Sequence, residues 1–335
     1  MPVNFIIMIR CCIIIVFTCC HLVLAAQTKP VIKNLVFEGA GIRGIAYCGA
    51  IHEMETAGML QHIEKVGGTS AGAIVALTIS LGYTGQEIQE IIAGTHFKKF
   101  NDGSYFFAGG INRMNKYFGW YRGQKIEDWF EELIFQKTGN ADITFEELHQ
   151  KRFKDLYITG TCLNKQKLII FSHETYPKMK VKDAVRISMS IPLYFEPVFI
   201  DQDGKIMRHP KHAEGLDVMV DGGFTGNFPI KIFDTDAKFN FATLGFRIDS
   251  DEQINNDRGS KDIAPMPVGN LKEYLNAFYN IVIENLNRQQ LTPEDWQRTI
   301  SISDGKIRPR IRKLSEKELT ILIGNGSQAM RNYLH

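Results

Sequence analysis

Residues 63–81 read IEKVGGTSAGAIVALTISL, and this stretch decides the fold class. Its first four residues form a short segment that predicts a β-strand, and residues 70–81 form an almost wholly apolar run that predicts a buried helix. Between them lies the pentapeptide GTSAG, residues 68–72, with Ser70 at its centre. A serine at a strand-to-helix turn adopts a strained backbone that exposes its hydroxyl, and small neighbours let strand and helix approach closely. The stretch therefore indicates an α/β fold with Ser70 as a candidate nucleophile, the alternative being a tight glycine-rich connection with an incidental serine.

A second glycine-rich segment precedes this one. Residues 31–37 are apolar and β-branched and predict a first strand, and residues 39–44 (GAGIRG) follow it and open a helix predicted at 44–57. Glycines at a helix N-terminus let backbone N–H groups face a bound anion. The same spacing is a dinucleotide fingerprint, but that interpretation needs an acidic residue after the second strand, and Glu64 lies at its start. A purely structural glycine turn remains a further alternative for this motif alone.

The rest of the chain continues the alternation of strands and helices. Further strands are predicted at 156–163, 167–172, 216–220 and 241–248, and further helices at 124–136, 182–190, 271–288 and 316–334. Thr84 with Glu87 and Thr144 with Glu147 are spaced as capping boxes, and each pair predicts the start of a further helix. Residues 249–267 are polar and predict a loop, and residues 96–121 contain nine aromatic residues without a clear period, which fits either a hydrophobic cluster or a mobile rim. This order predicts a layered α/β fold with a mainly parallel sheet.

A nucleophilic serine needs a base, which is usually a histidine. The histidines after Ser70 do not follow apolar strands in the way a catalytic histidine loop does; they are His96, His149, His173, His209, His212 and His335. Asp221 is better placed, because it follows the strand at 216–220 and precedes two glycines. Apolar surroundings raise the pKa of a carboxyl toward that of a useful base. The alternative for this motif is an ordinary Asp-Gly turn.

In this order, the glycine-rich loop, the Ser70 pentapeptide and the Asp221 motif resemble the patatin-like phospholipases, over about residues 34–236. Residues 188–192 (SMSIP) and 227–229 (NFP) are also similar to stretches of that family, whereas Ala40 stands where many members have a third glycine. The resemblance implies a three-layer α/β fold with a mainly parallel central sheet flanked by helices. It implies an oxyanion hole of Gly39, Ala40, Gly41, Ile42, Arg43 and Gly44, a nucleophile elbow of Gly68, Thr69, Ala71 and Gly72 around Ser70, and a dyad loop of Gly222 and Gly223 beside Asp221.

The activity that the resemblance implies is hydrolysis of lipid acyl esters through an acyl-enzyme. Asp221 would accept the proton of Ser70, and no metal or organic cofactor is required. The expected partner is a lipid at a membrane or micelle surface, and Arg43 either attracts a lipid phosphate or is a solvated arginine at a helix start. A catalytically silent lipid-binding member of the same fold is the alternative function.

Composition and the N-terminal segment set the remaining expectations. The chain has 335 residues, 44% hydrophobic and 23% charged, with a net charge of +2, which excludes a wholly disordered chain, a polytopic membrane protein and a strongly basic nucleic-acid binder. Residues 1–26 predict a secretory signal peptide, or alternatively an uncleaved membrane anchor, so the protein is expected to be exported or membrane-anchored. Residues 34–236 are the expected phospholipase domain, and residues 237–335 complete the same fold. Outside the N-terminal segment only Cys48 and Cys162 remain, which is no disulfide framework.

Overall fold

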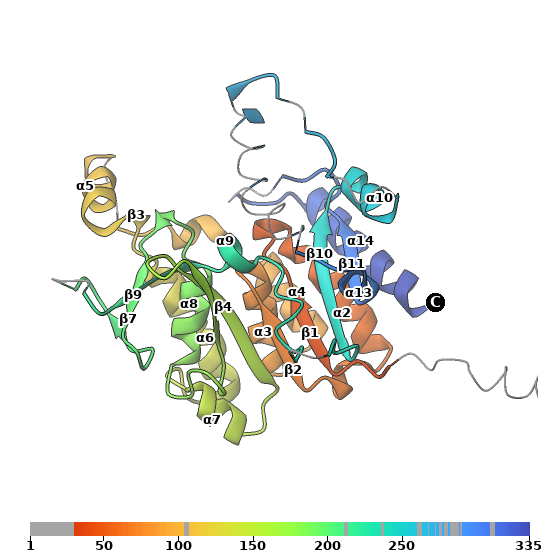
Figure 1. The fold of residues 1–335 in the computed structure, drawn as a ribbon, viewed down its shortest axis with the longest axis horizontal. Coiled ribbons are helices and arrows are strands. Elements are labelled where there is room, and N and C mark those ends of the chain that lie inside the picture. The colour runs from red at the N-terminus through yellow and green to blue at the C-terminus, as the bar shows by residue number, and fades with distance from the viewer. Residues whose placement is uncertain are drawn as a thin grey trace, which may run out of the picture. The chain divides into compact units, whose positions relative to one another are not determined.

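The sheet extends outward from two short buried strands, β1 (Asn34–Phe37) and β2 (Lys65–Gly68), which pair in parallel (Figure 1). On the other side of β1 lie β10 (Thr243–Asp249) and then β11 (Thr299–Ser303), again in parallel. On the other side of β2 lies β4 (Asp155–Cys162), also parallel. Five neighbouring parallel strands therefore form the larger part of the sheet, and the prediction of a mainly parallel α/β fold is confirmed.

The remainder of the sheet is antiparallel. Strand β4 pairs with both β5 and β9, and β7 and β8 continue beyond β9 to complete a nine-stranded sheet. A separate parallel pair joins β3 to β6. These strands are β3 (Gly119–Tyr121), β5 (Lys167–Phe171), β6 (Leu193–Phe195), β7 (Val198–Ile200), β8 (Ile206–Met207) and β9 (Asp217–Asp221). The four strands of two or three residues were not predicted, because such short runs have no period to detect.

Helices and short 3-10 turns (η) connect and cover the strands. They are η1 (Gly41–Ile45), α2 (Ala46–Thr56), η2 (Leu60–His62), α3 (Ala71–Ser80), α4 (Gly85–Ala93), η3 (Phe97–Phe100), α5 (Phe107–Tyr117), α6 (Gln124–Thr138), α7 (Phe145–Gln150), α8 (Val181–Ser188), α9 (Gly223–Gly226), α10 (Asp251–Gly259), α13 (Pro293–Gln297) and α14 (Glu316–Leu334). Capping boxes begin α4 at Thr84, α7 at Thr144 and α14 at Ser315. In each box a hydroxyl and a glutamate satisfy N–H groups that the helix leaves without a partner.

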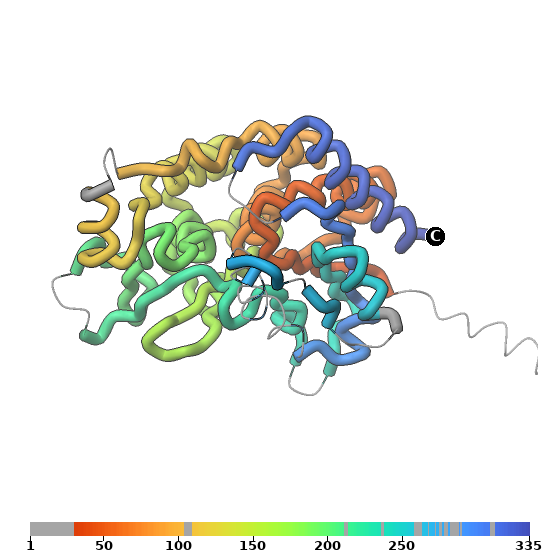
Figure 2. The backbone as a smooth tube through the Cα atoms, turned by 90° about the horizontal axis from the view of Figure 1, so that it is seen from above, coloured from red at the N-terminus to blue at the C-terminus, as the bar shows by residue number. Residues whose placement is uncertain are grey.

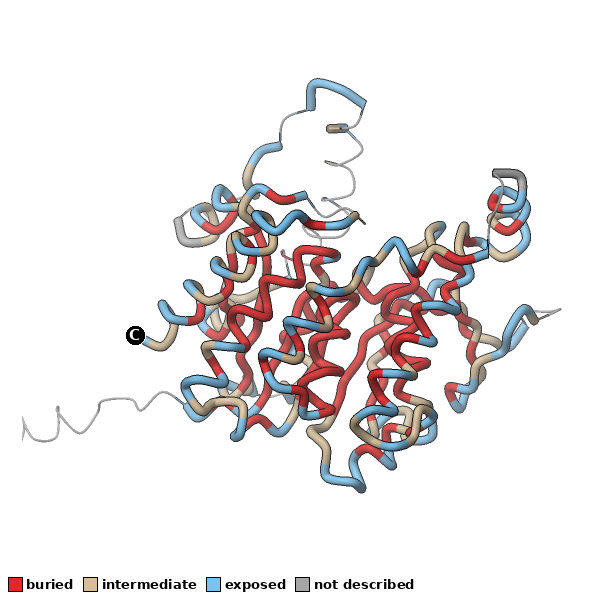
Figure 3. The backbone as a smooth tube through the Cα atoms, turned by 180° about the vertical axis from the view of Figure 1, so that it is seen from behind, coloured by how far each residue is buried: buried red, intermediate tan, exposed pale blue. Residues whose placement is uncertain are grey.

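The two faces of the sheet are covered to different extents. The main apolar cluster lies on the face covered by α3, and every residue of α3 is buried, as its apolar sequence predicts. Figure 3 shows this buried centre in red, with exposed positions on the outer helices and loops. A smaller cluster of Val36, Phe228 and Ile230 covers part of the other face. Apolar burial of this extent is the principal stabilising term of such a fold.

Helices from opposite ends of the chain cross at a very short distance. Figure 2 shows the blue C-terminal helix α14 beside the red segment that contains α2. A Cβ atom built on Gly49 would lie 1.9 Å from the carbonyl oxygen of Ile323, and one built on Gly326 would lie 1.9 Å from that of Ala46. The two backbones therefore approach so closely that only glycine fits at these positions.

The structure describes residues 30–103, 107–210, 214–235, 238–259, 263–266, 268–271, 290–308 and 312–335, with residues 273, 274, 277, 281 and 288. Residues Ile32–His335 form one unit. The predicted signal or anchor at 1–26 lies outside the described residues, as does most of the helix predicted at 271–288. Among the residues described, no helix has the length and apolar character needed to cross a bilayer.

One loop prediction was wrong, and a helix lies in the aromatic stretch where no period was found. Residues Asp251–Gly259 form α10 within the stretch predicted as loop, and Phe107–Tyr117 form α5 within the aromatic stretch 96–121. Within that stretch Phe100 is buried among the core residues, whereas Phe118 is 56% exposed. Part of the aromatic segment therefore belongs to the core of the fold.

Candidate active site

Ser70 occupies the sharp turn between β2 and α3. Its backbone angles are φ 53° and ψ −120°, a region that residues with a side chain rarely adopt and that costs about 1–3 kcal/mol. The glycines on either side permit this turn: a Cβ atom on Gly68 would lie 2.3 Å from the carbonyl oxygen of Gly72, and one on Gly72 would lie 2.3 Å from that of Phe37. The pentapeptide therefore brings the first turn of α3 into contact with the end of β1.

The hydroxyl of Ser70 points at the carboxylate of Asp221. Ser70 Oγ donates a hydrogen bond of 2.7 Å to Asp221 Oδ2, although the two residues are 151 positions apart in sequence. Asp221 Oδ1 accepts a second hydrogen bond, of 2.8 Å, from the N–H of Gly223. The Sδ atom of Met189 lies 3.9 Å from Ser70 Oγ. The structure thus brings together the two residues that the sequence analysis singled out from separate motifs.

Burial changes the acidity of this carboxyl group. Asp221 is 5% exposed. Burial raises the pKa of Asp221 from its ordinary value of 3.8 to about 6, while the hydrogen bonds from Ser70 and Gly223 act in the opposite direction. Desolvation dominates because it disfavours the charged form more than two hydrogen bonds favour it. At neutral pH the group is ionised, yet it holds a proton far more readily than an exposed aspartate.

The first glycine-rich loop lies beside Ser70. A Cβ atom on Gly39 would lie 3.3 Å from the Cβ of Ser70 and 2.4 Å from the side-chain oxygen of Asn227. Gly39 and Asn227 are joined by two hydrogen bonds of 3.0 Å, one from each residue to the backbone carbonyl of the other. Gly41 adopts φ +55° and begins η1, where the first N–H groups have no acceptor within the helix. Asn227 therefore fixes the position of the loop next to the serine.

The structure contradicts one of the two expectations for Arg43. Its side chain is buried, with Nη1 3.6 Å from Asp304 Oδ2 and Nε donating to the carbonyl of Ala40 at 3.4 Å. Its backbone N–H also donates to the carbonyl of Ala40, at 3.2 Å. The interpretation as a solvated arginine is wrong, and the guanidinium is already engaged by a carboxylate of this chain. The N–H groups of Gly39 and Arg43 are thus engaged within the protein, and those of Gly41 and Ile42, at the start of η1, are candidate donors.

Two further segments hold the elements of the site together. At the end of α8, Ser188 Oγ accepts a hydrogen bond of 2.9 Å from the N–H of Ser70, and the carbonyl of Ser190 accepts one of 2.9 Å from the N–H of Asp221. Under the turn, the hydroxyls of Thr69 and Thr159 lie 2.6 Å apart. Thr159 received no attention in the sequence analysis, because a threonine within a strand carries no signal of such a role.

A buried charged network behind the loop also escaped the sequence analysis. Glu38, directly before Gly39, is 2% exposed and lies 3.0 Å from the guanidinium of Arg247. Arg247 is fully buried between the rings of Phe228 and Trp296, whose centroids are 5.1 and 5.4 Å away. This buried network could not be predicted from the sequence, because charged residues are usually exposed.

The other sequence candidates lie elsewhere. His209 contacts Glu196 at 2.9 Å, and His149 and His173 share Asp155. His212 lies outside the described residues. Glu64, the acidic residue of the dinucleotide interpretation, precedes β2 and pairs with Lys33 at 2.8 Å on the surface, so the structure gives that interpretation no support.

Gly44, Ala71 and Gly222 complete the predicted set. A Cβ on Gly44 would lie 3.0 Å from the Cβ of Ala71, and one on Gly222 would lie 2.4 Å from the hydroxyl of Thr159. Small residues at these positions therefore allow the segments of the site to pack closely together.

Two pockets, of about 520 and 270 Å³, are lined by other residues, and neither includes Ser70 or Asp221.

The chain is similar in sequence to several known proteins. The family model described as patatin-like phospholipase matches residues 35–234, more than half of the chain. An uncharacterised protein of Acanthamoeba polyphaga mimivirus is 31% identical over 245 residues, which cover 73% of each chain. A probable lipid hydrolase of Invertebrate iridescent virus 6 is 26% identical over 206 residues, 60% of this chain and 62% of the viral protein.

Solved structures show the same fold at low sequence identity. VipD from Legionella pneumophila superposes with a TM-score of 0.57 at 16% identity, covering 91% of this chain and 67% of that one. ExoU of Pseudomonas aeruginosa, in its heterodimeric complex with SpcU, superposes with a TM-score of 0.51 at 17% identity, covering 92% and 52%. These likenesses concern the fold, and the family match concerns the sequence. The chain belongs to the patatin-like phospholipase family.

Proposed function

We propose that this chain hydrolyses ester bonds of acyl lipids, with Ser70 as the nucleophile and Asp221 as the general base. The observation that carries the proposal is the 2.7 Å hydrogen bond from Ser70 Oγ to Asp221 Oδ2 at a strained strand-to-helix turn. A base must lie within hydrogen-bond reach of the proton it removes, and its pKa should be near the working pH. Asp221, with a pKa raised to about 6 by burial, meets both conditions.

The reaction follows from these positions. Ser70 Oγ attacks the ester carbonyl carbon while its proton passes to Asp221, and the carbonyl oxygen becomes an oxyanion. The tetrahedral intermediate collapses, the alcohol portion leaves with the proton from Asp221, and the acyl group stays on Ser70. Water then attacks the acyl-enzyme, transfers a proton to Asp221, and releases the fatty acid as Ser70 recovers its proton.

The N–H groups of Gly41 and Ile42 are the proposed oxyanion donors. Both belong to the start of η1, which lies against the first turn of α3, as the contact between Gly44 and Ala71 indicates. Donors fixed in place before the reaction stabilise developing charge without a cost of reorganisation, and one such donor contributes about 2.7–4 kcal/mol. The two hydrogen bonds between Gly39 and Asn227 supply that fixed position.

The proposals for the substrate class and for the location of the protein rest on the family and on the sequence. Lipid substrates are met at a membrane or micelle surface, and residues 1–26 would export the protein or anchor it there. The alternative, a catalytically silent lipid-binding protein, has less support. A strained serine hydrogen-bonded to a buried carboxylate costs stability, and lipid binding alone does not require that arrangement.

The direct experiment is incubation of the purified protein with a mixed lipid extract, followed by mass spectrometry of released fatty acids and lysolipids. The wild-type protein should release fatty acids, and Ser70→Ala should release almost none. Ser301→Ala, which removes a serine hydroxyl from the edge strand β11, is the matched control and should keep full activity. Equal release by Ser70→Ala and wild type would refute the proposal, and no release by either would favour the silent alternative.

A further inference from the structure

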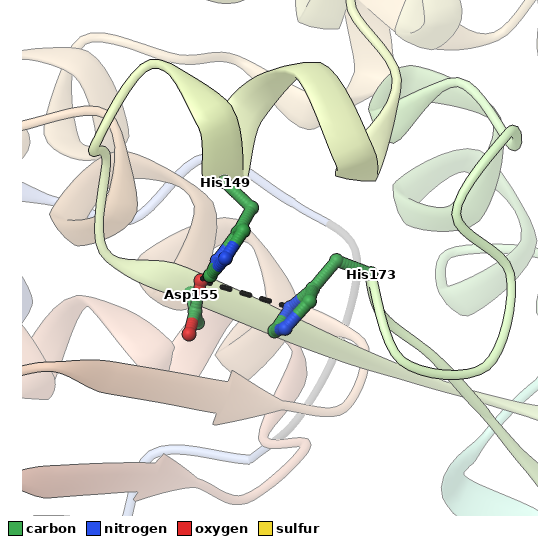
Figure 4. Close-up of side chains that lie close together, drawn as sticks. All are labelled: His149, Asp155 and His173. Atoms are coloured by element: carbon green, nitrogen blue, oxygen red, sulfur yellow. Dashed lines mark hydrogen bonds and ion pairs between the residues drawn. The ribbon is translucent and has the colours of Figure 1, made fainter.

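A second cluster of reactive side chains lies away from Ser70. His149 is near the end of α7, Asp155 is the first residue of β4, and His173 follows the end of β5 by two residues. Figure 4 shows that the three side chains converge from these three segments. His149 Nδ1 lies 2.7 Å and His173 Nδ1 3.6 Å from the same oxygen, Asp155 Oδ1.

The spacing of these atoms is close to that of a metal site. One ligand atom from each residue can be chosen so that all three lie within 4.8 Å of one another. In tetrahedral zinc sites, with bonds of about 2.0–2.2 Å, neighbouring ligand atoms are about 3.4 Å apart. Two imidazoles and a carboxylate are a donor set that suits Zn²⁺ and similar divalent transition metals.

The three side chains of the cluster differ in how far they are buried. The side chains of Asp155 and His173 are 17% and 19% exposed, whereas that of His149 is 52% exposed. The two imidazole rings are stacked with centroids 4.1 Å apart and 8° between their planes. An ion binds in the plane of each ring, so the more exposed His149 ring must turn to meet an ion placed by Asp155 and His173.

A carboxylate lies near the second ring nitrogen of His173. Its Nε2 atom lies 3.9 Å from Glu174 Oε1, and that carboxylate accepts hydrogen bonds from Tyr157 at 2.8 Å and from Lys65 at 3.2 Å. A carboxylate near the second nitrogen of a metal-binding histidine favours the tautomer that leaves the first nitrogen free for the metal.

We propose that His149, Asp155 and His173 bind a divalent transition-metal ion of the zinc class. Three protein ligands leave one position for water. Bound there, the ion would join the end of α7, the start of β4 and the turn after β5. The site is separate from the proposed hydrolysis, because Asp155 lies five residues along β4 from Gly160, the partner of Asp221. Five residues of strand span about 17 Å.

Equilibrium dialysis of the full-length protein against Zn²⁺ tests the proposal. The protein carries no polyhistidine tag, and its accessible thiols are alkylated first, because residues 11–20 contain four cysteines. Wild type should bind one more zinc ion per chain than the double variant His149→Ala/His173→Ala. The matched control, His52→Ala/His62→Ala, removes two exposed histidines elsewhere and should bind as wild type does. Equal stoichiometry in wild type and the first double variant would overturn the proposal.

Cobalt spectra supply a second readout. Co²⁺ should produce visible d–d bands in wild type and in the control, without a thiolate band in the near ultraviolet. Asp155→Asn, which keeps the shape of the side chain, should lose the visible bands while its circular dichroism stays that of wild type. Glu174→Gln should keep the stoichiometry and weaken zinc binding about 10–100-fold. Visible bands that persist in Asp155→Asn would place the ion elsewhere and overturn the assignment.

Discussion

Replacing Asp221 with asparagine should make the protein more stable at neutral pH while it abolishes hydrolysis. Asparagine has the same shape, so its Oδ1 can still accept the N–H of Gly223 and its Nδ2 can donate to Ser70 Oγ. The substitution removes only the charge. The pKa of Asp221 is raised from 3.8 to about 6 by burial, and that rise corresponds to about 3 kcal/mol of folding free energy.

The sign of the effect follows from the direction of the shift. Because the pKa of Asp221 is higher in the folded than in the unfolded protein, the folded protein binds this proton more tightly. Stability is therefore lost as the pH rises from about 4, where the unfolded state ionises, to about 6, where the folded state follows. The full penalty persists above pH 6, and it falls to a small remainder at pH 4. The variant should be more stable by about 3 kcal/mol at pH 8, or about 5 °C in melting temperature, and by close to nothing at pH 4.

Thermal and urea unfolding at pH 4, 6 and 8 measure this difference. Asp203→Asn, on an exposed turn, is the matched control and should show no pH-dependent gain. In the wild type, kcat/KM should rise with pH through about 6 as Asp221 ionises. A gain in stability that is the same at pH 4 and pH 8, or an Asp221→Asn variant with substantial activity, would refute the reasoning.

Three further predictions concern the loop and the helix crossing. Gly41→Val should lower kcat about 10²–10³-fold with little change in KM in a steady-state assay, because a bulky residue displaces an oxyanion donor. An effect on KM alone would mean that the loop only binds substrate. Asn227→Ala should lower the free energy of unfolding by about 1–3 kcal/mol and reduce kcat, because the carbonyl of Gly39 loses its side-chain donor. An unchanged kcat would show that the loop does not depend on this hydrogen bond. Gly326→Ala should lower the free energy of unfolding by about 1–3 kcal/mol in urea, whereas Gly324→Ala, in the same helix with open space around it, should leave it unchanged or raise it. Equal effects of the two substitutions would contradict the close crossing of α2 and α14.

The parts of the fold that could be predicted from the sequence are those that short local patterns determine. The hydroxyl and glutamate of each capping box are three residues apart, so Thr84, Thr144 and Ser315 mark helix starts without reference to the rest of the chain. The apolar run of α3 likewise predicts its own burial. By contrast, α10 has a polar sequence with no apolar face, and nothing local distinguishes it from a loop.

The candidate site was predictable in its residues but not in its contacts. Glycine spacing around Ser70 and Asp221 marks both motifs, because close approach of backbones requires small residues there. The link between Ser188 and the N–H of Ser70 joins residues 118 positions apart, and the pair of Thr69 and Thr159 joins residues 90 apart. Such contacts depend on how the strands are ordered in the sheet, which no local pattern encodes.

The central claim is that Ser70 is a nucleophile activated by Asp221. Its most direct measurement is covalent labelling with a fluorophosphonate probe, followed by peptide mapping of the adduct by mass spectrometry. The account predicts an adduct on Ser70 in the wild type, a much slower adduct in Asp221→Asn, and none in Ser70→Ala. An adduct on a different serine, or labelling of Ser70 at the same rate in Asp221→Asn, would contradict it.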